Sequence, residues 1–336
     1  MIGYYIHHHG QGHRARAASI CSALATAVTA LSSAPLPPSP AKCFADAIRL
    51  PRDDRGGPPV DPTAHETLHW APLLDRGLQS RMSRIATWIE STRPSLMVVD
   101  VSVEAAVFVR LLGVPVVVMA MPGDRTDSAH RLGYQLAEHI ISAWPQEIYD
   151  PTWLQEFAHK TTFVGGISRF DGRACADPPP SGRPQVLVLS GTGGSSLTMD
   201  DIRRCAQQHR GYRWQALGVP GAPWTDDPWP QLSSADVVIS HAGQNAVADI
   251  ATARRPAIII AQERPFDEQQ AIAAALAAHG LAVSVPQWPP VTAWPHLIET
   301  ALALGGGRWP RWQTAGAAAR AAAVIDTLAK QSESSR

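Results

Sequence analysis

Short apolar runs alternate along the chain with stretches in which apolar residues recur every three to four positions. The runs have the length of buried parallel strands, and the recurrent spacing is typical of helices packed on a sheet. Residues 74–90 show the helical spacing, with Leu74, Leu78, Ile85 and Ile89 on one face. The pattern predicts an α/β protein. In the first half, strands are expected at residues 2–6, 28–32, 96–99 and 114–119, and helices at 13–25, 74–90 and 103–112.

Two breaks in composition divide the chain. Residues 34–72 are rich in proline, aspartate and glycine, which interrupt regular elements, so we expect an irregular excursion there. Residues 177–184 read Asp-Pro-Pro-Pro-Ser-Gly-Arg-Pro, the composition of a stiff connector between domains. We therefore expect a first domain at residues 1–176, a linker at 177–184, a second domain at 185–310, and a C-terminal helix and tail at 311–336.

The alternation of strand and helix begins again after the linker. Short crossovers favour parallel, doubly wound sheets in both domains. Two such domains facing each other would place a ligand cleft between the carboxyl ends of their strands. In the second half, strands are expected at residues 186–189, 212–217, 236–239, 257–260 and 281–285, and helices at 200–209, 245–253, 267–279, 292–304 and 312–330.

Composition narrows the classes of function. The 336 residues are 45% hydrophobic, enough for a core in each of two domains. Basic and acidic residues each total 29, so there is no excess charge for binding nucleic acid. Four widely spaced cysteines predict neither disulfides nor a zinc cluster. We expect a cytoplasmic protein, soluble or membrane-peripheral, because no apolar run reaches ~18 to 20 residues. An alternative is that residues 14–34, which are alanine-rich after two arginines, act as a secretory signal.

A glycine loop, Gly-Gln-Gly-His at residues 10–13, joins the first expected strand to the first expected helix. Glycines allow positive φ and close approach to a ligand, and a helix start offers free N–H groups. With Ala15 the loop also fits the Gly-x-Gly-x-x-Ala pattern of dinucleotide-binding folds. Those folds need an acidic residue about 20 positions on, whereas the first acidic residue here is Asp46. A nicotinamide cofactor is therefore disfavoured, and no cofactor is expected.

His13 and Asp100 are the candidate catalytic pair. A histidine at a helix start is suited to general base catalysis near neutral pH. Asp100 ends an expected strand, so its carboxylate should point toward the same cleft and could orient the imidazole. The alternatives are a histidine that only hydrogen-bonds its own loop, and an aspartate that caps the helix expected at residues 103–112.

A second glycine-rich loop, Ser-Gly-Thr-Gly-Gly-Ser-Ser at residues 190–196, follows the first strand of the second domain. Its N–H groups could bind a diphosphate without a lysine. An ordinary glycine-serine turn is the alternative. The loop lacks the Gly-x-x-x-x-Gly-Lys pattern, which argues against ATP hydrolysis.

The most specific pattern reads Ser-His-Ala-Gly-Gln-Asn-Ala-Val-Ala-Asp at residues 240–249, followed by Arg255-Pro256 and by Asp-Glu-Gln-Gln at 267–270. It resembles the donor-binding signature of GT-B fold nucleotide-sugar glycosyltransferases. In the plant UDP-glycosyltransferases the signature contains His-Cys-Gly-Trp-Asn-Ser, then Glu, Gly-Val-Pro and Asp-Gln. In the peptidoglycan GlcNAc transferase of family 28 it contains Ser-Gly, a Glu six residues later, then Gly-Leu-Pro and Gln-Gln.

This resemblance covers both halves of the chain and implies an α/β GT-B fold, with two Rossmann-like domains facing an interdomain cleft. Gly12-His13 looks like the amino-terminal Gly-His of these enzymes, and Asp100 like the partner of that histidine. His13 would then deprotonate the acceptor. Asp249 would bind the ribose hydroxyls, and Glu268 with Gln269 the donor sugar. The other donor-binding residues implied are Gly12, Gly191, Thr192, Gly193, Gly194, His241, Gly243 and Asn245.

This sequence also departs from the family pattern. Asp249 is one methylene shorter than the usual glutamate, Gln244 replaces the tryptophan of the plant enzymes, and Ile272 stands where an asparagine often follows the Asp-Gln pair. The aspartate pairs at residues 53–54 and 226–227 lie in proline-rich loops, where solvated turns are expected. No metal site is therefore expected.

The resemblance implies an inverting, metal-independent hexosyltransferase that moves a sugar from a nucleotide diphosphate, UDP, to an acceptor hydroxyl. The acceptor is left open among small molecules, glycans and lipids, and a lipid acceptor would go with peripheral membrane association. The alternatives are a GT-B-like nucleotide-sugar hydrolase or epimerase, and a non-catalytic sugar-nucleotide sensor.

Overall fold

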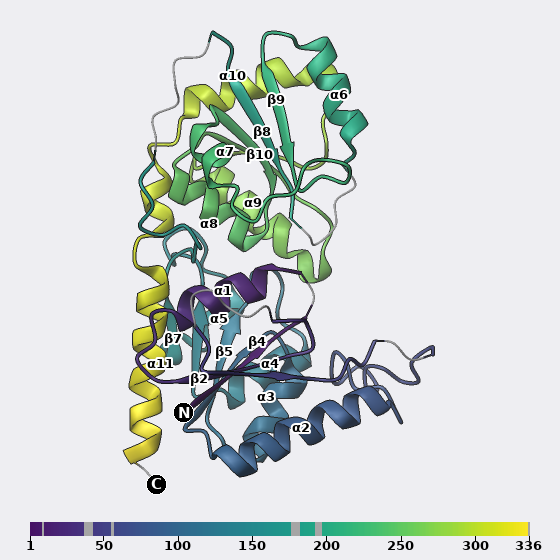
Figure 1. The fold of residues 1–336 in the computed structure, drawn as a ribbon, viewed down its shortest axis with the longest axis vertical. Coiled ribbons are helices and arrows are strands. Elements are labelled where there is room, and N and C mark those ends of the chain that lie inside the picture. The colour runs from purple at the N-terminus through teal and green to yellow at the C-terminus, as the bar shows by residue number, and fades with distance from the viewer. Residues whose placement is uncertain (9, 37–42, 55–56, 176–181, 192–196, 335–336) are drawn as a thin grey trace.

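The computed structural model describes residues 1–8, 10–36, 43–54, 57–175, 182–191 and 197–334. Two parallel sheets form two domains, one above the other in Figure 1. The strands of the first sheet, in the spatial order β3-β2-β1-β4-β5-β6-β7, are β1 (Ile2–Ile6), β2 (Val28–Ser32), β3 (Asp46–Arg49), β4 (Leu96–Asp100), β5 (Val116–Ala120), β6 (His139–Ser142) and β7 (Thr161–Phe163). Those of the second, in the order β12-β11-β10-β8-β9, are β8 (Gln185–Leu189), β9 (Arg213–Leu217), β10 (Val237–His241), β11 (Ala257–Ile260) and β12 (Val283–Val285).

Helices cover both faces of each sheet, which is why the central strands are apolar throughout. In the first domain they are α1 (Gly12–Cys21), α2 (Arg76–Thr92), α3 (Val103–Leu111), α4 (Ser128–Leu136) and α5 (Thr152–Gln155). The later helices are α6 (Met199–Gln208), α7 (Trp229–Ser234), α8 (Gln244–Ala253), α9 (Glu268–Ala278), α10 (Trp294–Leu304) and α11 (Ala317–Ser334). Short 3₁₀ turns are η1 (Ala158–Lys160), η2 (Pro265–Asp267), η3 (Val291–Ala293) and η4 (Trp309–Trp312).

The strand register in the first domain determines where Asp100 lies relative to the glycine loop. Ile6 pairs with Ser32 on one side and with Asp100 on the other, so Asp100 lies beside the residue at which the chain leaves β1 for the glycine loop. Ser102, not Asp100, caps α3 by accepting from the N–H of Ala105. The capping alternative for Asp100 is therefore wrong, because the chain makes a further turn before α3 begins.

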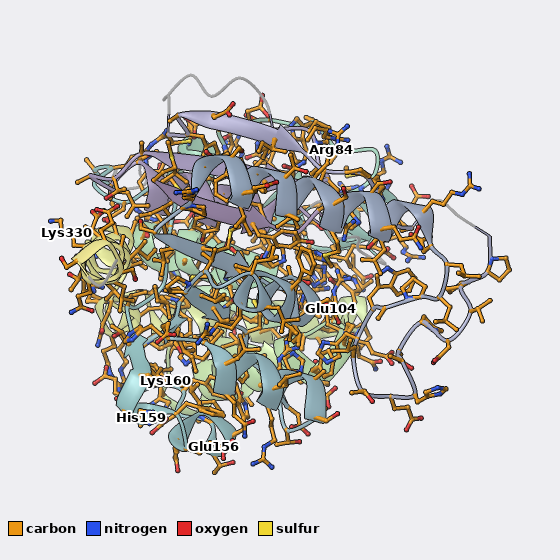
Figure 2. All side chains as sticks on the ribbon, turned by 90° about the horizontal axis from the view of Figure 1, so that it is seen from below. Arg84, Glu104, Glu156, His159, Lys160 and Lys330 are labelled. Atoms are coloured by element: carbon orange, nitrogen blue, oxygen red, sulfur yellow. The ribbon has the colours of Figure 1, made fainter. Side chains whose placement is uncertain are left out.

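The excursion at residues 34–72 is not wholly irregular. It contains β3, an edge strand whose exposed side chains follow no apolar pattern, so periodicity could not reveal it. Its later part is held against α3, because the N–H groups of His69 and Trp70 donate to Glu104 Oε1 at 2.8 and 2.9 Å. Figure 2 shows Glu104 on the side of the molecule where this segment lies.

The last helix, α11, returns to the first domain and runs down its side in Figure 1. Its Ala321 and Ile325 lie in the same buried cluster as Ala17 and Ile20 of α1. A separate cluster crosses between the domains and joins Trp144 and Phe170 of the first to side chains such as Val247 and Trp312. The domains therefore share apolar packing. Within the described residues, no helix is both long and apolar enough to span a bilayer.

Candidate active site

His13 lies in the first turn of α1, next to the carboxyl end of β4. Its Nδ1 is 2.9 Å from Oδ1 of Asp100, and the side chain is 17% exposed. A hydrogen on Nδ1 would be donated to the carboxylate, which leaves Nε2 able to accept a proton. The two residues that the sequence pairs are in contact, in an arrangement suited to general base catalysis.

Arg16 is a second partner of Asp100 that the sequence analysis missed. Its Nε donates to Oδ2 at 3.0 Å, and its Nη2 donates to Oδ1 at 2.5 Å. Burial alone would raise the pKa of Asp100, but the charges of Arg16 and His13 hold it well below its usual range. Asp100 is therefore a fixed anion. The signal in the sequence was an arginine three residues after His13, on the same helix face.

The start of α8 lies against the start of α1, across the domain interface. Asn245 Nδ2 donates to the carbonyl of Gly12 at 2.7 Å, and Arg16 Nη1 donates to Oε1 of Gln244 at 2.8 Å. Gly243 is the N-cap of α8 and has no side chain to cap the helix. The N–H groups of this first turn, with the helix dipole, are suited to binding an anion.

His241 ends β10, just before this helix. Its Nδ1 donates to the carbonyl of Ile260 at 3.0 Å, and burial lowers the pKa of the imidazole. A carbonyl can only accept, so Nδ1 carries the hydrogen and Nε2 is an acceptor in the neutral form. Donation from Nε2 to a phosphate would therefore require that His241 gain a proton.

Asp249 lies on α8 and already has partners in the first domain. Ser168 Oγ donates to its Oδ1 at 2.7 Å, and Arg169 Nε donates to its Oδ2 at 3.3 Å. The residue is 5% exposed. Burial raises the pKa of Asp249 to about 6, although Arg169 and Ser168 act to lower it. A ribose would have to share or displace these partners to reach the carboxylate.

Glu268 and Gln269 begin α9, after a loop that contacts the first domain. Glu268 Oε2 lies 3.5 Å from Arg125 Nη2, whereas Gln269 is buried and its Oε1 accepts from the N–H of Gln262 at 3.0 Å. The Arg125 guanidinium also lies over the ring of Phe266, 4.5 Å from its centre. The structure thus places Glu268 at the interface, while the side chain of Gln269 bonds the backbone of the loop that precedes α9.

His130 belongs to a hydrogen-bonded chain beside this loop. Asp127 is 2.9 Å from His69 Nε2 and 2.5 Å from His130 Nδ1, and Arg125 Nη1 is 3.2 Å from His130 Nε2. Burial lowers the pKa of His130 to about 4, despite Asp127. The arginine can only donate, so Nδ1 carries the hydrogen and is bonded to Asp127. His69, Asp127 and His130 lie close enough together to share a metal ion, but the charge of Arg125 beside His130 Nε2 opposes a cation there.

The aspartate pair at residues 53–54 differs from expectation. Asp53 is 5% exposed and pairs with Arg81 at 2.6 Å, so it is a buried ion pair and not a solvated turn. Asp54 pairs with Arg52. Asp53 and Asp54 lie within ligand distance of His8, which makes this a second geometric candidate for a metal. Two arginines compensate the two carboxylates, and this lowers the attraction for a cation.

The phosphate-loop prediction falls largely on residues that the structure does not describe. Gly191 is described and exposed, whereas Thr192, Gly193 and Gly194 lie outside the described residues. Of the linker expected at 177–184, only residues 182–184 are described.

Solved structures identify the architecture. A UDP-glucosyltransferase from Polygonum tinctorium superimposes with a TM-score of 0.67 and 16% identity, covering 98% of each chain. The glycotransferase of kitacinnamycin gives 0.65 with 15% identity, covering 97% of this chain and 98% of that one. MurG from Acinetobacter baumannii gives 0.58 with 16% identity, covering 97% and 100%. The chain has the GT-B fold.

A family model matches part of the second domain of this GT-B protein, and curated relatives match part of the chain. Residues 182–289 match the glycosyltransferase family 28 C-terminal domain. A UDP-N-acetylglucosamine--N-acetylmuramyl-(pentapeptide) pyrophosphoryl-undecaprenol N-acetylglucosamine transferase from Bartonella henselae is 30% identical over 149 residues, 36% of this chain and 39% of the relative. The enzyme of the same name from Rhizobium etli is 39% identical over 160 residues, 39% and 43%. The chain thus spans about two fifths of the length of these relatives.

Proposed function

We propose that this protein is a glycosyltransferase that moves a sugar from a nucleotide diphosphate, UDP, to an acceptor hydroxyl with inversion. The observation that carries the proposal is the contact of His13 with Asp100 next to the uncapped start of α8. The GT-B fold and the family 28 match of the second domain support a nucleotide-sugar donor.

In the proposed reaction, Nε2 of His13 takes the proton of the acceptor hydroxyl. The oxygen of that hydroxyl attacks C1 of the donor sugar. The bond from C1 to the diphosphate breaks, and the leaving UDP keeps the electron pair. Asp100 stabilises the imidazolium that forms. The N–H groups at the start of α8 stabilise the charge that develops on the diphosphate. A single displacement of this kind inverts the anomeric carbon.

We assign the donor residues as the resemblance implies. The diphosphate would be bound by Gly12, the loop from Gly191 to Gly194, His241, Gly243 and Asn245. Asp249 would bind the ribose, and Glu268 with Gln269 would read the sugar. In this assignment, Asp249 exchanges at least part of its contact with Arg169 for a ribose hydroxyl. No metal is assigned a role in transfer.

The names of the relatives supply a first acceptor class to test. The enzymes from Bartonella henselae and Rhizobium etli are named for an acceptor linked to pyrophosphoryl-undecaprenol. We therefore propose a lipid-linked glycan as the first acceptor to test, with the protein cytoplasmic and peripheral to the membrane.

Product analysis tests the function. The protein is incubated with UDP-, dTDP- and GDP-sugars, with and without lipid-linked and small-molecule acceptors, and products are identified by mass spectrometry and anomeric NMR. We expect acceptor-dependent release of UDP, an inverted product, and equal rates with and without EDTA. Free sugar released at full rate without acceptor would instead identify a hydrolase, a changed sugar an epimerase, and binding without turnover a sensor.

A further inference from the structure

Arg16 is a buried cation that bonds both the proposed catalytic pair and the opposite domain. The residue is 3% exposed. Two of its nitrogens donate to the two oxygens of Asp100, and the third donates to Oε1 of Gln244. One side chain thus connects the partner of His13 with the first turn of α8.

The planar fork of an arginine fixes the plane of a carboxylate that it bonds with two nitrogens. Asp100 Oδ1 lies 2.9 Å from His13 Nδ1, so the orientation of this carboxylate decides how the imidazole is held. A lysine at position 16 would preserve the charge but would supply only a point donor. The orientation of Asp100 therefore depends on the planar shape of the guanidinium as well as on its charge.

Arg16 also affects the charge balance at His13. Its Nη2 is 3.2 Å from His13 Nδ1, where a positive charge opposes formation of the imidazolium that Asp100 favours. The other titratable groups near this pair are His7, whose ring centre is 5.8 Å from that of His13, and Tyr4 and Glu268, which act on Arg16 from β1 and α9. Removal of Arg16 would leave the negative charge of Asp100 to act on His13 with less compensation.

Gln244 is bound mainly to Arg16. Its Oε1 accepts from Arg16, while its Nε2 is buried and makes no hydrogen bond within the described part of the chain. A glutamine at the first turn of a helix could extend into solvent, where both ends of the amide are hydrated. The inward placement of Gln244 is therefore accounted for by its bond to Arg16.

We propose that Arg16 is a positioning residue of the transfer reaction. It fixes the Asp100 carboxylate in the plane from which that carboxylate bonds His13. Through Gln244 it also connects the pair to α8, the helix proposed to bind the donor diphosphate. The inference rests on the proposed function for its kinetic consequences, while the placement of Asp100 and His13 can be tested without turnover.

The kinetic test compares Arg16→Met, Arg16→Lys and Gln244→Leu with the wild type, with Arg203→Met on the exposed face of α6 as the control for loss of an arginine. Arg16→Met should lower kcat about tenfold or more while the KM for the donor changes less, because a positioning residue acts on the chemical step. Arg16→Lys should also lower kcat, because a point donor does not fix the plane of the carboxylate. Gln244→Leu should lower kcat about tenfold, because the link from Arg16 to α8 is lost.

The second readout is the NMR signal of the His13 ring at one fixed pH, assigned by the signal that is lost in His13→Gln. Its chemical shift should change in Arg16→Met, where Asp100 is no longer held, and stay in Arg203→Met. If the wild type transfers no sugar, the proposed function fails, yet an unchanged His13 signal in Arg16→Met would still overturn the positioning role by itself. Circular dichroism checks folding first, because Asp100 is buried. Should Arg16→Met not fold, wild-type kcat in Arg16→Lys, which keeps the charge but not the two-nitrogen bond to Asp100, overturns the proposal.

Discussion

The ionisation of Asp249 should make the protein less stable as the pH rises. Burial raises the pKa of this carboxyl to about 6 in the folded state, against about 3.9 in an unfolded chain. Between these values the folded state keeps a proton that the unfolded state has released, so folding is favoured fully below about pH 4. The contribution is lost as the pH rises through about 6. Asp249→Asn removes the ionisation and with it this part of the pH dependence.

The magnitude follows from the pKa difference. About two pKa units correspond to roughly 3 kcal/mol of unfolding free energy. The stability of the wild type relative to Asp249→Asn should therefore fall by roughly 3 kcal/mol between pH 3 and pH 7. Urea unfolding followed by tryptophan fluorescence at several pH values measures this difference. Asp226→Asn, at an exposed aspartate near Arg169, is the control.

Parallel stability curves for the wild type and Asp249→Asn would refute the reasoning, because the carboxyl would then ionise alike in both states. Calorimetry with UDP at pH 7.5 tests the other proposed use of the residue. If the ribose binds the carboxylate, the variant should lose about tenfold or more in UDP affinity. Unchanged affinity would restrict Asp249 to its contact with Ser168 and Arg169.

Three further predictions concern the domain interface and the base. His13→Ala should lower turnover by about 10² to 10⁴ with UDP affinity near wild type, measured by initial rates and calorimetry; turnover at the wild-type level would place the base elsewhere. Gly123→Ala should lower the free energy of unfolding by about 1 to 3 kcal/mol more than Gly172→Ala. Both glycines have positive φ, but only a Cβ at Gly123 would meet a backbone oxygen, at 2.0 Å. Equal losses of stability in urea unfolding would count against this contact. Asn245→Ala should weaken UDP binding by about 1 kcal/mol in calorimetry, because an amide at the start of α8 is lost; unaltered binding would remove it from the donor site.

Sequence patterns located the central strands because a strand buried on both faces must be apolar throughout. The expected bounds of β1, β2 and β11 agree with the structure. The expected strand at residues 114–119 begins two residues early and ends one residue early, since a continuous apolar run does not mark where pairing begins. The first-domain strands β6 and β7 were missed because they are short, and β7 is only half-buried.

The site could be predicted where the functional residues lie at or just after the end of a strand. His13 and Asp100 were placed together because they lie near the carboxyl ends of β1 and β4, and such ends share one edge of a parallel sheet. The partners of Asp249 were not predictable. Ser168 and Arg169 are about 80 residues away in sequence, in a segment with no motif of its own.

The sequence by itself determined the GT-B architecture and the position of each motif relative to its strand, because hydrophobic period and glycine placement act over a few neighbouring residues. The tertiary structure alone decided which charged and polar side chains bond one another. Arg16 reaches Gln244 across 228 positions, and α11 returns to complete the core of the first domain. Such contacts depend on how two domains and a terminal helix pack together. Neighbouring charges keep Asp100 ionised, whereas burial raises the pKa of Asp249.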